Sequence, residues 1–211
     1  MSIFSLTKEI LFPPAELAEE DGLLAIGGDL SVDRLMLAYH SGIFPWFEGE
    51  FPLWFSPDPR FVLFPQEMQV SKSMKQLIRQ EKFRFSMNEA FEKVITHCSE
   101  IRRAGQRGTW ITEDMKSAYI RLHQMGFAHS AEAWLEDELV GGLYGVKLNR
   151  VFCGESMFSK QSNSSKFAFI KFSDWLVGNG IELIDCQVFT KHLASLGARM
   201  IPRKEYLRFL R

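Results

Sequence analysis

The sequence lacks the features that mark several classes of protein. Its three cysteines, Cys98, Cys153 and Cys186, are far apart, and its five histidines have no metal-ligand spacing. These patterns exclude a disulfide framework and a zinc site. No apolar run approaches the roughly 20 residues that span a bilayer, and the charged pair Lys8-Glu9 comes too early for a secretory signal. We therefore expect a cytoplasmic protein that does not associate with a membrane.

Charge is nearly balanced overall but unevenly distributed along the chain. The 211 residues are 46% hydrophobic and 24% charged, as in a globular protein, and the formal net charge is −1. Residues 1–60 carry three basic and ten acidic side chains, whereas residues 61–211 carry 22 basic and 16 acidic ones. The later part is predicted to face an anion such as nucleic acid; the alternative is two solvated faces of opposite sign.

Glycine and proline divide the chain near residue 60. Residues 1–60 are predicted to be irregular apart from one helix, which Ser31 caps and Gly42 ends. Regular elements follow, and Asn88 and Thr112 are predicted to cap two of the later helices. We expect a small N-terminal domain at 1–60 and a larger domain at 61–211. Strands are predicted at 60–64, 83–85, 128–135, 139–148, 150–156, 183–186 and 198–201, and helices at 72–79, 89–101, 113–125, 166–177, 191–196 and from 202.

The order of these elements indicates the fold class. Helices come first, then a meander of three strands, then helices and strands in alternation. This order predicts an α+β fold around one mixed sheet, and it is compatible with an acetyltransferase-like (GNAT-like) arrangement.

Three tryptophans lie in loops, where neither helical nor strand periodicity explains them. Trp46 and Trp54 stand among glycines and prolines, and Trp110 follows three arginines and precedes a predicted helix. Such rings can stack on a base while arginines and the free N–H groups of a helix start face phosphates. The alternatives are that the tryptophans fill a domain interface and that the arginines form a solvated turn.

Polar side chains at the ends of two predicted strands are the candidate catalytic groups. Glu155 and Asp185 lie in apolar segments, where a carboxylate is costly to bury without a partner. Gln187 shares a face with Asp185 because side chains alternate along a strand. If the two strands are neighbours, the three groups converge; the alternative is a structural carboxylate that ties backbone amides together. Apolar side chains from several elements are predicted to lie around them: Leu143, Phe152, Met157, Phe167, Phe169 and Phe172.

Eight collinear segments resemble the leucyl/phenylalanyl-tRNA–protein transferase family, from about residue 12 to residue 206. Together they cover nearly the whole chain, which makes the resemblance far more specific than any one of them. The segments are LAIGGDL at 24–30, GIFPW at 42–46, WFSP at 54–57, GTWIT at 108–112, VGGLYGV at 140–146, GESMFS at 154–159, LIDCQ at 183–187 and SLGA at 195–198.

The resemblance implies a small N-terminal domain, a GNAT-like C-terminal domain and a specific reaction. Leu, Phe and, less well, Met would be moved from aminoacyl-tRNA to proteins that begin with Arg or Lys, which marks them for degradation by the N-degron pathway. No metal or coenzyme is implied, and we expect a monomer.

The resemblance also implies roles for individual residues. Trp46 and Trp110 would hold the 3′-terminal adenosine of the tRNA. Glu155 would contact the aminoacyl amino group, while Asp185 and Gln187 would assist the reaction. The sequence departs from the family pattern at Phe167 and Phe169, where smaller side chains are usual, so the preference among Leu, Phe and Met stays open. The side-chain pocket would comprise Leu143, Phe152, Met157, Phe169 and Phe172.

The implied reaction limits what these groups need to do. An aminoacyl ester is already activated, so the reaction needs positioning, removal of one amine proton and stabilisation of an oxyanion. Gln187 is too weak a base to act alone, and we expect it to orient the amine. Asp185 would polarise Gln187 or bind the positive charge of the substrate.

Two other functions fit parts of the sequence. The first is an acyl-CoA-dependent N-acetyltransferase, but the loop after strand 150–156 has no glycine to cradle a pyrophosphate. The second is a non-catalytic binding module for tRNA or for basic N-terminal residues. Glu155, Asp185 and Gln187 together argue against that second alternative.

Overall fold

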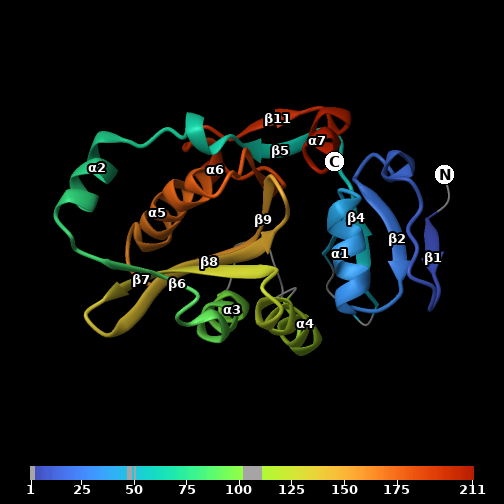
Figure 1. Cartoon of the computed structure of the whole chain (residues 1–211), viewed down its shortest axis with the longest axis horizontal. Helices are drawn as coiled ribbons and strands as arrows, with labels where there is room; N and C mark the ends of the chain where they lie inside the picture. Colours follow the sequence, from blue (N-terminus) through green and yellow to red (C-terminus); the bar gives the residue numbers. More distant parts are fainter. Residues whose placement is uncertain (1–2, 47–48, 50, 102–110) are drawn as a thin grey trace.

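The computed structural model describes residues 3–46, 49, 51–101 and 111–211, which form two sheets with helices packed against them (Figure 1). The smaller sheet comes from the N-terminal part of the chain and the larger one from the rest. None of the helices in the described ranges has the length and hydropathy of a membrane span.

The N-terminal part forms a four-stranded sheet, so the prediction of an irregular segment with one helix was wrong about the strands. Each strand has only two to five residues, which is too short for an alternating pattern among glycines and prolines to be recognised. The predicted helix is confirmed as α1 (Val32–His40), and the Ser31 hydroxyl accepts a hydrogen bond from the Arg34 N–H. The strands lie in the order β1 (Phe4–Leu6), β2 (Leu23–Gly27), β4 (Leu53–Phe55) and β3 (Phe44–Pro45).

The larger sheet has seven strands and is mixed, which confirms the predicted α+β class. Every neighbouring pair is antiparallel except β9 and β10, which run parallel. The predicted meander is β7–β8–β9, and the alternation of helices and strands after it is also confirmed. The strand order is β11 (Arg199–Ile201), β5 (Arg60–Leu63), β10 (Leu183–Gln187), β9 (Val151–Ser159), β8 (Glu138–Lys147), β7 (Ala128–Leu135) and β6 (Arg84–Met87).

Helices cover both faces of this sheet. The long helix α5 lies on one face, α3 and α4 lie on the other, and α1 of the N-terminal part lies beside α4 (Figure 1). Side chains of β8 alternate accordingly: Leu143 packs with the α5 side, and Tyr144 packs with the α3 and α4 side. The helices are α2 (Lys72–Arg79), α3 (Phe91–Glu100), α4 (Glu113–Gln124), α5 (Ser164–Gly178), α6 (Lys191–Ala194) and α7 (Arg203–Phe209).

One hydrophobic core continues from the N-terminal part into the larger sheet. Leu35 and Tyr39 of α1 belong to the same buried cluster as Val94 of α3 and Tyr119 of α4. The strand that opens the larger sheet, β5, begins at Arg60. The division of the chain into domains at 1–60 and 61–211 stays a prediction.

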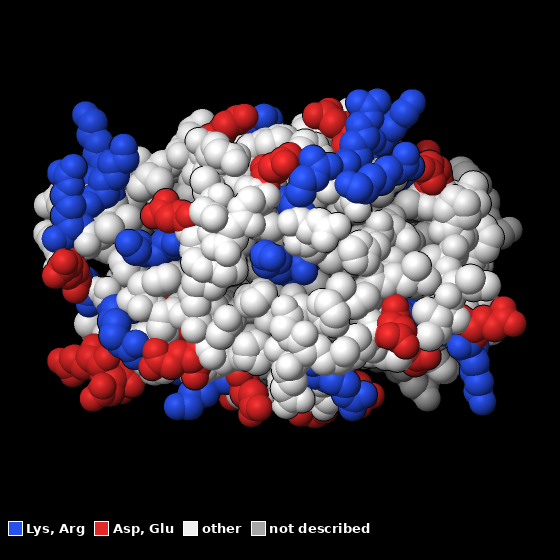
Figure 2. All heavy atoms as spheres, in the orientation of Figure 1, with Lys and Arg blue, Asp and Glu red and all other residues white. Residues whose placement is uncertain are grey.

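Charged side chains are grouped on the surface. Figure 2 shows Lys and Arg side chains gathered at the end of the molecule that carries α2 and again over β11 and α7. In and just after α2 the exposed residues include Lys72, Lys75, Arg79 and Lys82. These are surfaces of the basic part of the chain, residues 61–211.

Candidate active site

A cavity of about 450 Å³ opens where the parallel strands β9 and β10 stop pairing. Their last paired residues are Cys153 and Asp185, and the residues that follow on each strand line the cavity. This confirms that the two strands are neighbours and that Glu155, Asp185 and Gln187 converge. Splayed ends of adjacent strands expose side chains of both to one space, which is a common place for a ligand.

Two β-bulges set the direction of the polar side chains. The pairing of β8 with β9 moves from Tyr144–Ser156 to Gly145–Gly154, so Glu155 is an extra residue in β9. A bulge redirects a side chain and bends its strand. The pairing of β10 with β5 also shifts, between Asp185 and Gln187, and Gln187 has a φ of 62°. Both shifts fall at residues that line the cavity.

Asp185 is fully buried and its carboxylate is completely occupied. Arg60 binds it with two hydrogen bonds, from Nε at 2.8 Å and from Nη2 at 2.7 Å. The Tyr206 hydroxyl donates at 2.8 Å and the backbone N–H of Gln187 at 2.9 Å. A carboxylate accepts about four hydrogen bonds, so no position is left for a substrate ammonium. The expectation that Asp185 binds the positive charge of the substrate is therefore wrong in this arrangement.

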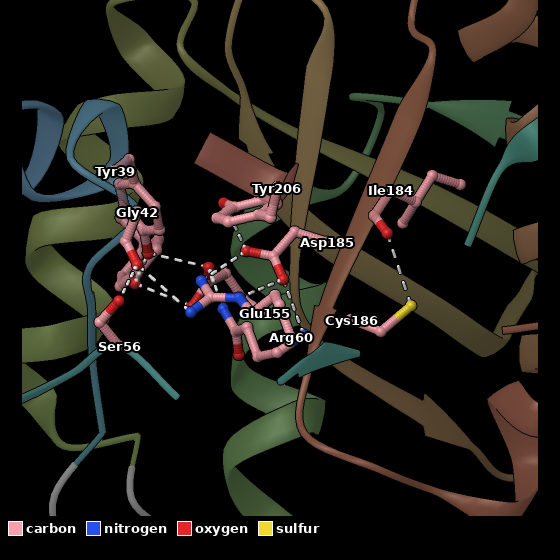
Figure 3. Close-up of polar contacts among 11 residues, drawn as sticks. Tyr39, Gly42, Ser56, Arg60, Glu155, Ile184, Asp185, Cys186 and Tyr206 are labelled. Carbon is pink, nitrogen blue, oxygen red and sulfur yellow. Dashed lines mark hydrogen bonds and ion pairs between the residues drawn. The ribbon is translucent and has the colours of Figure 1, made fainter. Parts of the chain in front are cut away.

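Arg60 connects this carboxylate to the N-terminal part of the chain (Figure 3). Its guanidinium lies 4.7 Å from the ring centre of Phe44 and 4.6 Å from that of Tyr206, and Nη1 donates to the Gly42 carbonyl at 3.2 Å. Burial lowers the pKa of Arg60, but the charge of Asp185 outweighs this and raises the pKa above its ordinary value. The buried ion pair therefore forms a fixed connection between Asp185 of β10 and the N-terminal part of the chain, next to the cavity.

Glu155 is held by hydroxyl and amide groups rather than by a cation. The Tyr39 hydroxyl donates to Oε1 at 2.8 Å, the Tyr119 hydroxyl to Oε2 at 2.9 Å, and Gln187 Nε2 to Oε1 at 3.0 Å. The oxygen atoms of the two tyrosine hydroxyls also lie within hydrogen-bonding distance of each other. Glu155 therefore orients the side chain of Gln187 through one of the two N–H donors of Nε2.

Burial dominates the electrostatics of Glu155. It raises the pKa of this carboxyl group to about 7; the hydrogen bonds from Tyr39, Tyr119 and Gln187 act to lower it, and the nearby charge of Asp185 acts to raise it. Burial also raises the pKa values of Tyr39 and Tyr119, and the charge of Glu155 adds to this effect. Glu155 can therefore gain or lose a proton near neutral pH while both tyrosines keep theirs.

Apolar side chains form the opposite wall of the cavity. Leu143, Met157 and Phe169 line it, as predicted from the sequence. Phe152 and Phe172, predicted with them, do not line it: both are fully buried, and their rings pack edge to face with centres 4.9 Å apart. They lie in the core on the α5 side of the sheet and support the wall from behind.

The structure places the predicted tryptophans in different environments. Trp46 lines the cavity and is 36% exposed, with its ring centre 5.7 Å from that of Phe55. Trp54 is buried, donates to the Gly27 carbonyl and packs against Phe12, so these contacts lie within the N-terminal part rather than at the domain interface considered as the alternative. Trp110 and the arginines before it lie outside the described residues.

The sequence prediction missed several residues of the site. Tyr39, Tyr119 and Arg60 were absent from it, and so was His192, which lines the cavity and whose Nε2 atom has no hydrogen-bond partner among the described residues. Burial and the charge of Lys166 lower the pKa of His192. Arg60 could have been recognised from the sequence, because it is the single cation of an apolar strand, just as Asp185 is the single anion of another. The tyrosines could not, because they fall at apolar positions of ordinary helices.

The described residues include no group of three or more His, Cys, Asp or Glu side chains placed to hold a metal ion. The polar side chains that line the cavity include Glu155, whose pKa is raised, Gln187, whose side chain is held by Glu155, and His192. Such a set can position an amine and accept a proton.

Comparison with known proteins identifies relatives along the whole chain. The family model of the leucyl/phenylalanyl-tRNA protein transferase matches residues 62–211, and the model of that family's N-terminal domain matches residues 28–58. A leucyl/phenylalanyl-tRNA–protein transferase of Syntrophobacter fumaroxidans is 54% identical over 211 residues, which are 100% of this chain and 90% of the relative. One from Flavobacterium johnsoniae is 52% identical and covers 99% of both chains.

Solved structures resemble the chain only distantly. L-PGS from Bacillus licheniformis matches with a TM-score of 0.43 at 12% identity, over 82% of this chain and 57% of that one. A GCN5-related N-acetyltransferase from Kribbella flavida matches with a TM-score of 0.41 at 8% identity, over 80% and 59%. The chain thus spans less than two thirds of these solved structures, and at such scores the likeness says nothing about function.

Proposed function

The chain belongs to the leucyl/phenylalanyl-tRNA protein transferase family, and we propose that it moves leucine, phenylalanine and, less well, methionine from aminoacyl-tRNA to proteins whose first residue is arginine or lysine. The relatives are named as aminoacyltransferases, and this chain is an aminoacyltransferase as well. The products would enter the N-degron pathway for degradation. We expect the reaction in the cytoplasm, where charged tRNA is found, and a monomeric enzyme.

The observation that carries this proposal is one cavity with an apolar wall and a polar wall. Leu143, Met157 and Phe169 offer an apolar surface for a large aliphatic or aromatic side chain, while Glu155 and Gln187 face the same space. A volume of about 450 Å³ is in the range of small-molecule sites. It suits an aminoacyl group with its ester carbonyl between the two walls.

Gln187 is the group best placed to orient the attacking amine. Its Nε2 donates to Glu155, which leaves the amide oxygen to accept a hydrogen bond from an amine N–H. Positioning of this kind lowers the barrier because the ester is already activated. In this proposal Glu155 contacts the aminoacyl amino group, while Asp185 is a positioning residue that holds Arg60 and the backbone of Gln187.

The tRNA would approach from the open side of the cavity. Trp46, at the mouth, offers a ring on which the 3′-terminal adenine can stack. Trp110, outside the described residues, is proposed as a second contact on the strength of the family resemblance. The phosphate backbone would meet the exposed cations in and after α2 and those near α7, such as Lys204 and Arg208.

A transfer assay with purified protein tests this proposal. Labelled phenylalanyl-tRNA should donate its amino acid to a peptide that begins with arginine but much less to the same peptide beginning with alanine, and not at all to its N-acetylated form. Acetyl-CoA should not replace the tRNA as donor. Transfer from acetyl-CoA, or binding of tRNA without transfer, would instead support one of the two alternatives.

A further inference from the structure

Glu155, which lines the cavity, forms a closed ring of polar contacts with two buried tyrosines behind it. Tyr39 donates to Glu155 Oε1, Tyr119 donates to Glu155 Oε2, and the two hydroxyls contact each other. The side chains come from α1, α4 and β9, and all three are buried. The ring therefore joins α1 of the N-terminal part to strand β9 of the larger sheet and to helix α4, which covers that sheet.

The number of protons in this ring decides how many of its oxygen–oxygen contacts are hydrogen bonds. It has three oxygen–oxygen contacts, and the two hydroxyls supply one hydrogen each. When Glu155 is ionised, one of the three contacts has no hydrogen and two oxygens face each other directly. When Glu155 is protonated, each contact has one hydrogen. The arrangement is complete only with the additional proton.

We propose that Glu155, Tyr39 and Tyr119 form a proton store for the transfer reaction: the ring takes up the proton that the attacking amine must lose and returns it to the 3′-oxygen of the departing tRNA. This inference rests on the proposed function and deepens it, because it assigns Glu155 a catalytic step and makes Tyr39 and Tyr119 positioning residues for that step.

The step is balanced without any further reactant. The amine nitrogen attacks the ester carbon, a C–N bond forms, and the carbonyl electron pair moves onto oxygen. The nitrogen, now positively charged, releases one proton to the ring. The carbonyl then reforms as the bond to the 3′-oxygen breaks, and that oxygen takes the proton back from the ring. One ester becomes one amide, and Glu155 returns to its initial state.

Glu155 has one position left through which the proton can enter. Among the described residues, Oε1 accepts from Tyr39 and Gln187, whereas Oε2 accepts only from Tyr119, and a carboxylate accepts about four hydrogen bonds. The proposed contact with the aminoacyl amino group would use this position. In the tetrahedral intermediate the two nitrogens are bonded to adjacent carbons, close enough for a hydrogen bond. The amino group can therefore pass one proton to Glu155 while it takes one from the attacking nitrogen.

The surroundings of Glu155 suit a group that both takes and gives a proton. Burial raises its pKa to about 7, and acid–base catalysis is most effective when the pKa lies near the working pH. The buried tyrosines keep their protons and act as neutral partners. In the part of the chain that the structure describes, the other titratable groups near it are Cys153 on the same strand, Tyr144 on β8, whose ring packs edge to face on Tyr119, and Asp185, Arg60 and Tyr206 beside β10.

Infrared difference spectroscopy of the free enzyme tests the store without using its activity. The carbonyl stretch of a protonated carboxyl group should disappear as pH rises through about 7, and it should be absent in Glu155→Gln. In Tyr119→Phe, and likewise in Tyr39→Phe, the midpoint should rise by about one pH unit or more, because the carboxylate loses a donor. Glu132→Gln is the matched control: Glu132 is also buried and held by two serine hydroxyls, but it does not line the cavity, so this variant should leave the band unchanged.

Single-turnover transfer at saturating phenylalanyl-tRNA completes the test. Glu155→Gln should slow transfer about 100-fold or more, and Tyr119→Phe should move the acid limb of the rate profile to higher pH by as much as its infrared midpoint moves. Suppose that the wild type transfers phenylalanine but that Tyr119→Phe lowers the rate equally at all pH values, without a shift of the pH–rate profile. That result would overturn the proton store and leave the proposed function intact. A wild type that shows the titration but transfers nothing would overturn the proposed function, and the store with it.

Discussion

At the residue scale, the site depends on one buried ion pair whose partners come from distant parts of the chain. Arg60 and Asp185 are each about 1% exposed and bind each other through two hydrogen bonds. Removal of one partner from such a pair leaves the other charge buried without compensation, which is far more costly than loss of a surface pair. Asp185 also accepts a hydrogen bond from the backbone N–H of Gln187, so in the proposed function the pair links stability to catalysis.

Asp185→Asn should therefore lower both stability and turnover. We expect the free energy of unfolding to fall by about 3–5 kcal/mol and transfer to slow, while the affinity for aminoacyl-tRNA stays nearly unchanged, because Asp185 has no free acceptor for a ligand. Urea denaturation, transfer assays and filter binding measure the three quantities. Glu67→Gln, which breaks an exposed pair with Arg199, is the control and should change little. A large loss of tRNA binding in Asp185→Asn would contradict the positioning role.

Glu155 predicts a second effect, on the pH dependence of stability. Its pKa is raised by burial from 4.5 to about 7 in the folded protein, so the folded state holds a proton that the unfolded state has already released between these values. The stabilisation is full below pH 4.5 and is lost as pH rises through 7. Relative to Glu155→Gln, the wild type should lose about 3 kcal/mol over this interval. Denaturation of both proteins at several pH values measures this difference, and parallel curves would contradict it.

At the scale of elements, the bulge that redirects Glu155 needs a glycine on the neighbouring strand. A Cβ atom at Gly145 would be in hard contact with the carbonyl oxygen of Cys153 and the ring of Phe152. We expect Gly145→Ala to lower the free energy of unfolding by about 1–3 kcal/mol. The substitution should also slow transfer, because it displaces Glu155. Gly178→Ala, at the end of α5 where a Cβ meets nothing within 4 Å, is the matched control and should be neutral or slightly stabilising. Equal effects of the two substitutions on unfolding would contradict this account of the bulge.

The elements with strong local signals were predictable from the sequence. The Ser31 and Thr112 side chains do cap α1 and α4, because a short side chain can satisfy a free N–H wherever the helix is placed. Asn88 does not cap α3, whose N-cap is Ala90. It has a φ of 58° and binds the backbone N–H of Ser130 on β7 instead. A tertiary contact displaced the local preference there.

The site was predictable only in part, for a related physical reason. Glu155, Asp185 and Gln187 were recognisable because polar groups at the ends of apolar strands need partners. The identity of those partners depends on tertiary packing: Tyr39 lies 116 residues from Glu155 in sequence, and Arg60 lies 125 residues from Asp185. The bulge at Glu155 explains another miss. Phe152 and Met157 pack on the same side of the sheet although they are an odd number of residues apart, and only Met157 reaches the cavity.

At the scale of the whole molecule, the proposed function needs a surface for a large polyanion and a cavity for the small apolar group that it delivers. The basic residues of the later part of the chain gather on the surface over α2 and near α7 (Figure 2), while the acidic N-terminal part supplies Trp46 at the mouth of the cavity. Affinity would come from phosphates along the surface, and selectivity for the amino acid from Leu143, Met157 and Phe169.

The affinity for aminoacyl-tRNA should therefore fall steeply with salt. Each phosphate contact contributes about 0.7–0.9 to the slope of log affinity against log salt concentration, so Lys72→Glu combined with Lys75→Glu should reduce the slope by about 1–2. Lys8→Glu, an exposed substitution in the acidic N-terminal part, is the control and should leave the slope unchanged. A slope near zero in the wild type would contradict docking on the basic surface.

A structure of the enzyme with a hydrolysis-resistant amide analogue of phenylalanyl-adenosine tests the central claim most directly. The account predicts that the phenyl ring lies against Leu143, Met157 and Phe169, the carbonyl beside Gln187 and the amino group at Glu155 Oε2, with adenine against Trp46. An analogue that binds elsewhere, or whose amino group points away from Glu155, would contradict it.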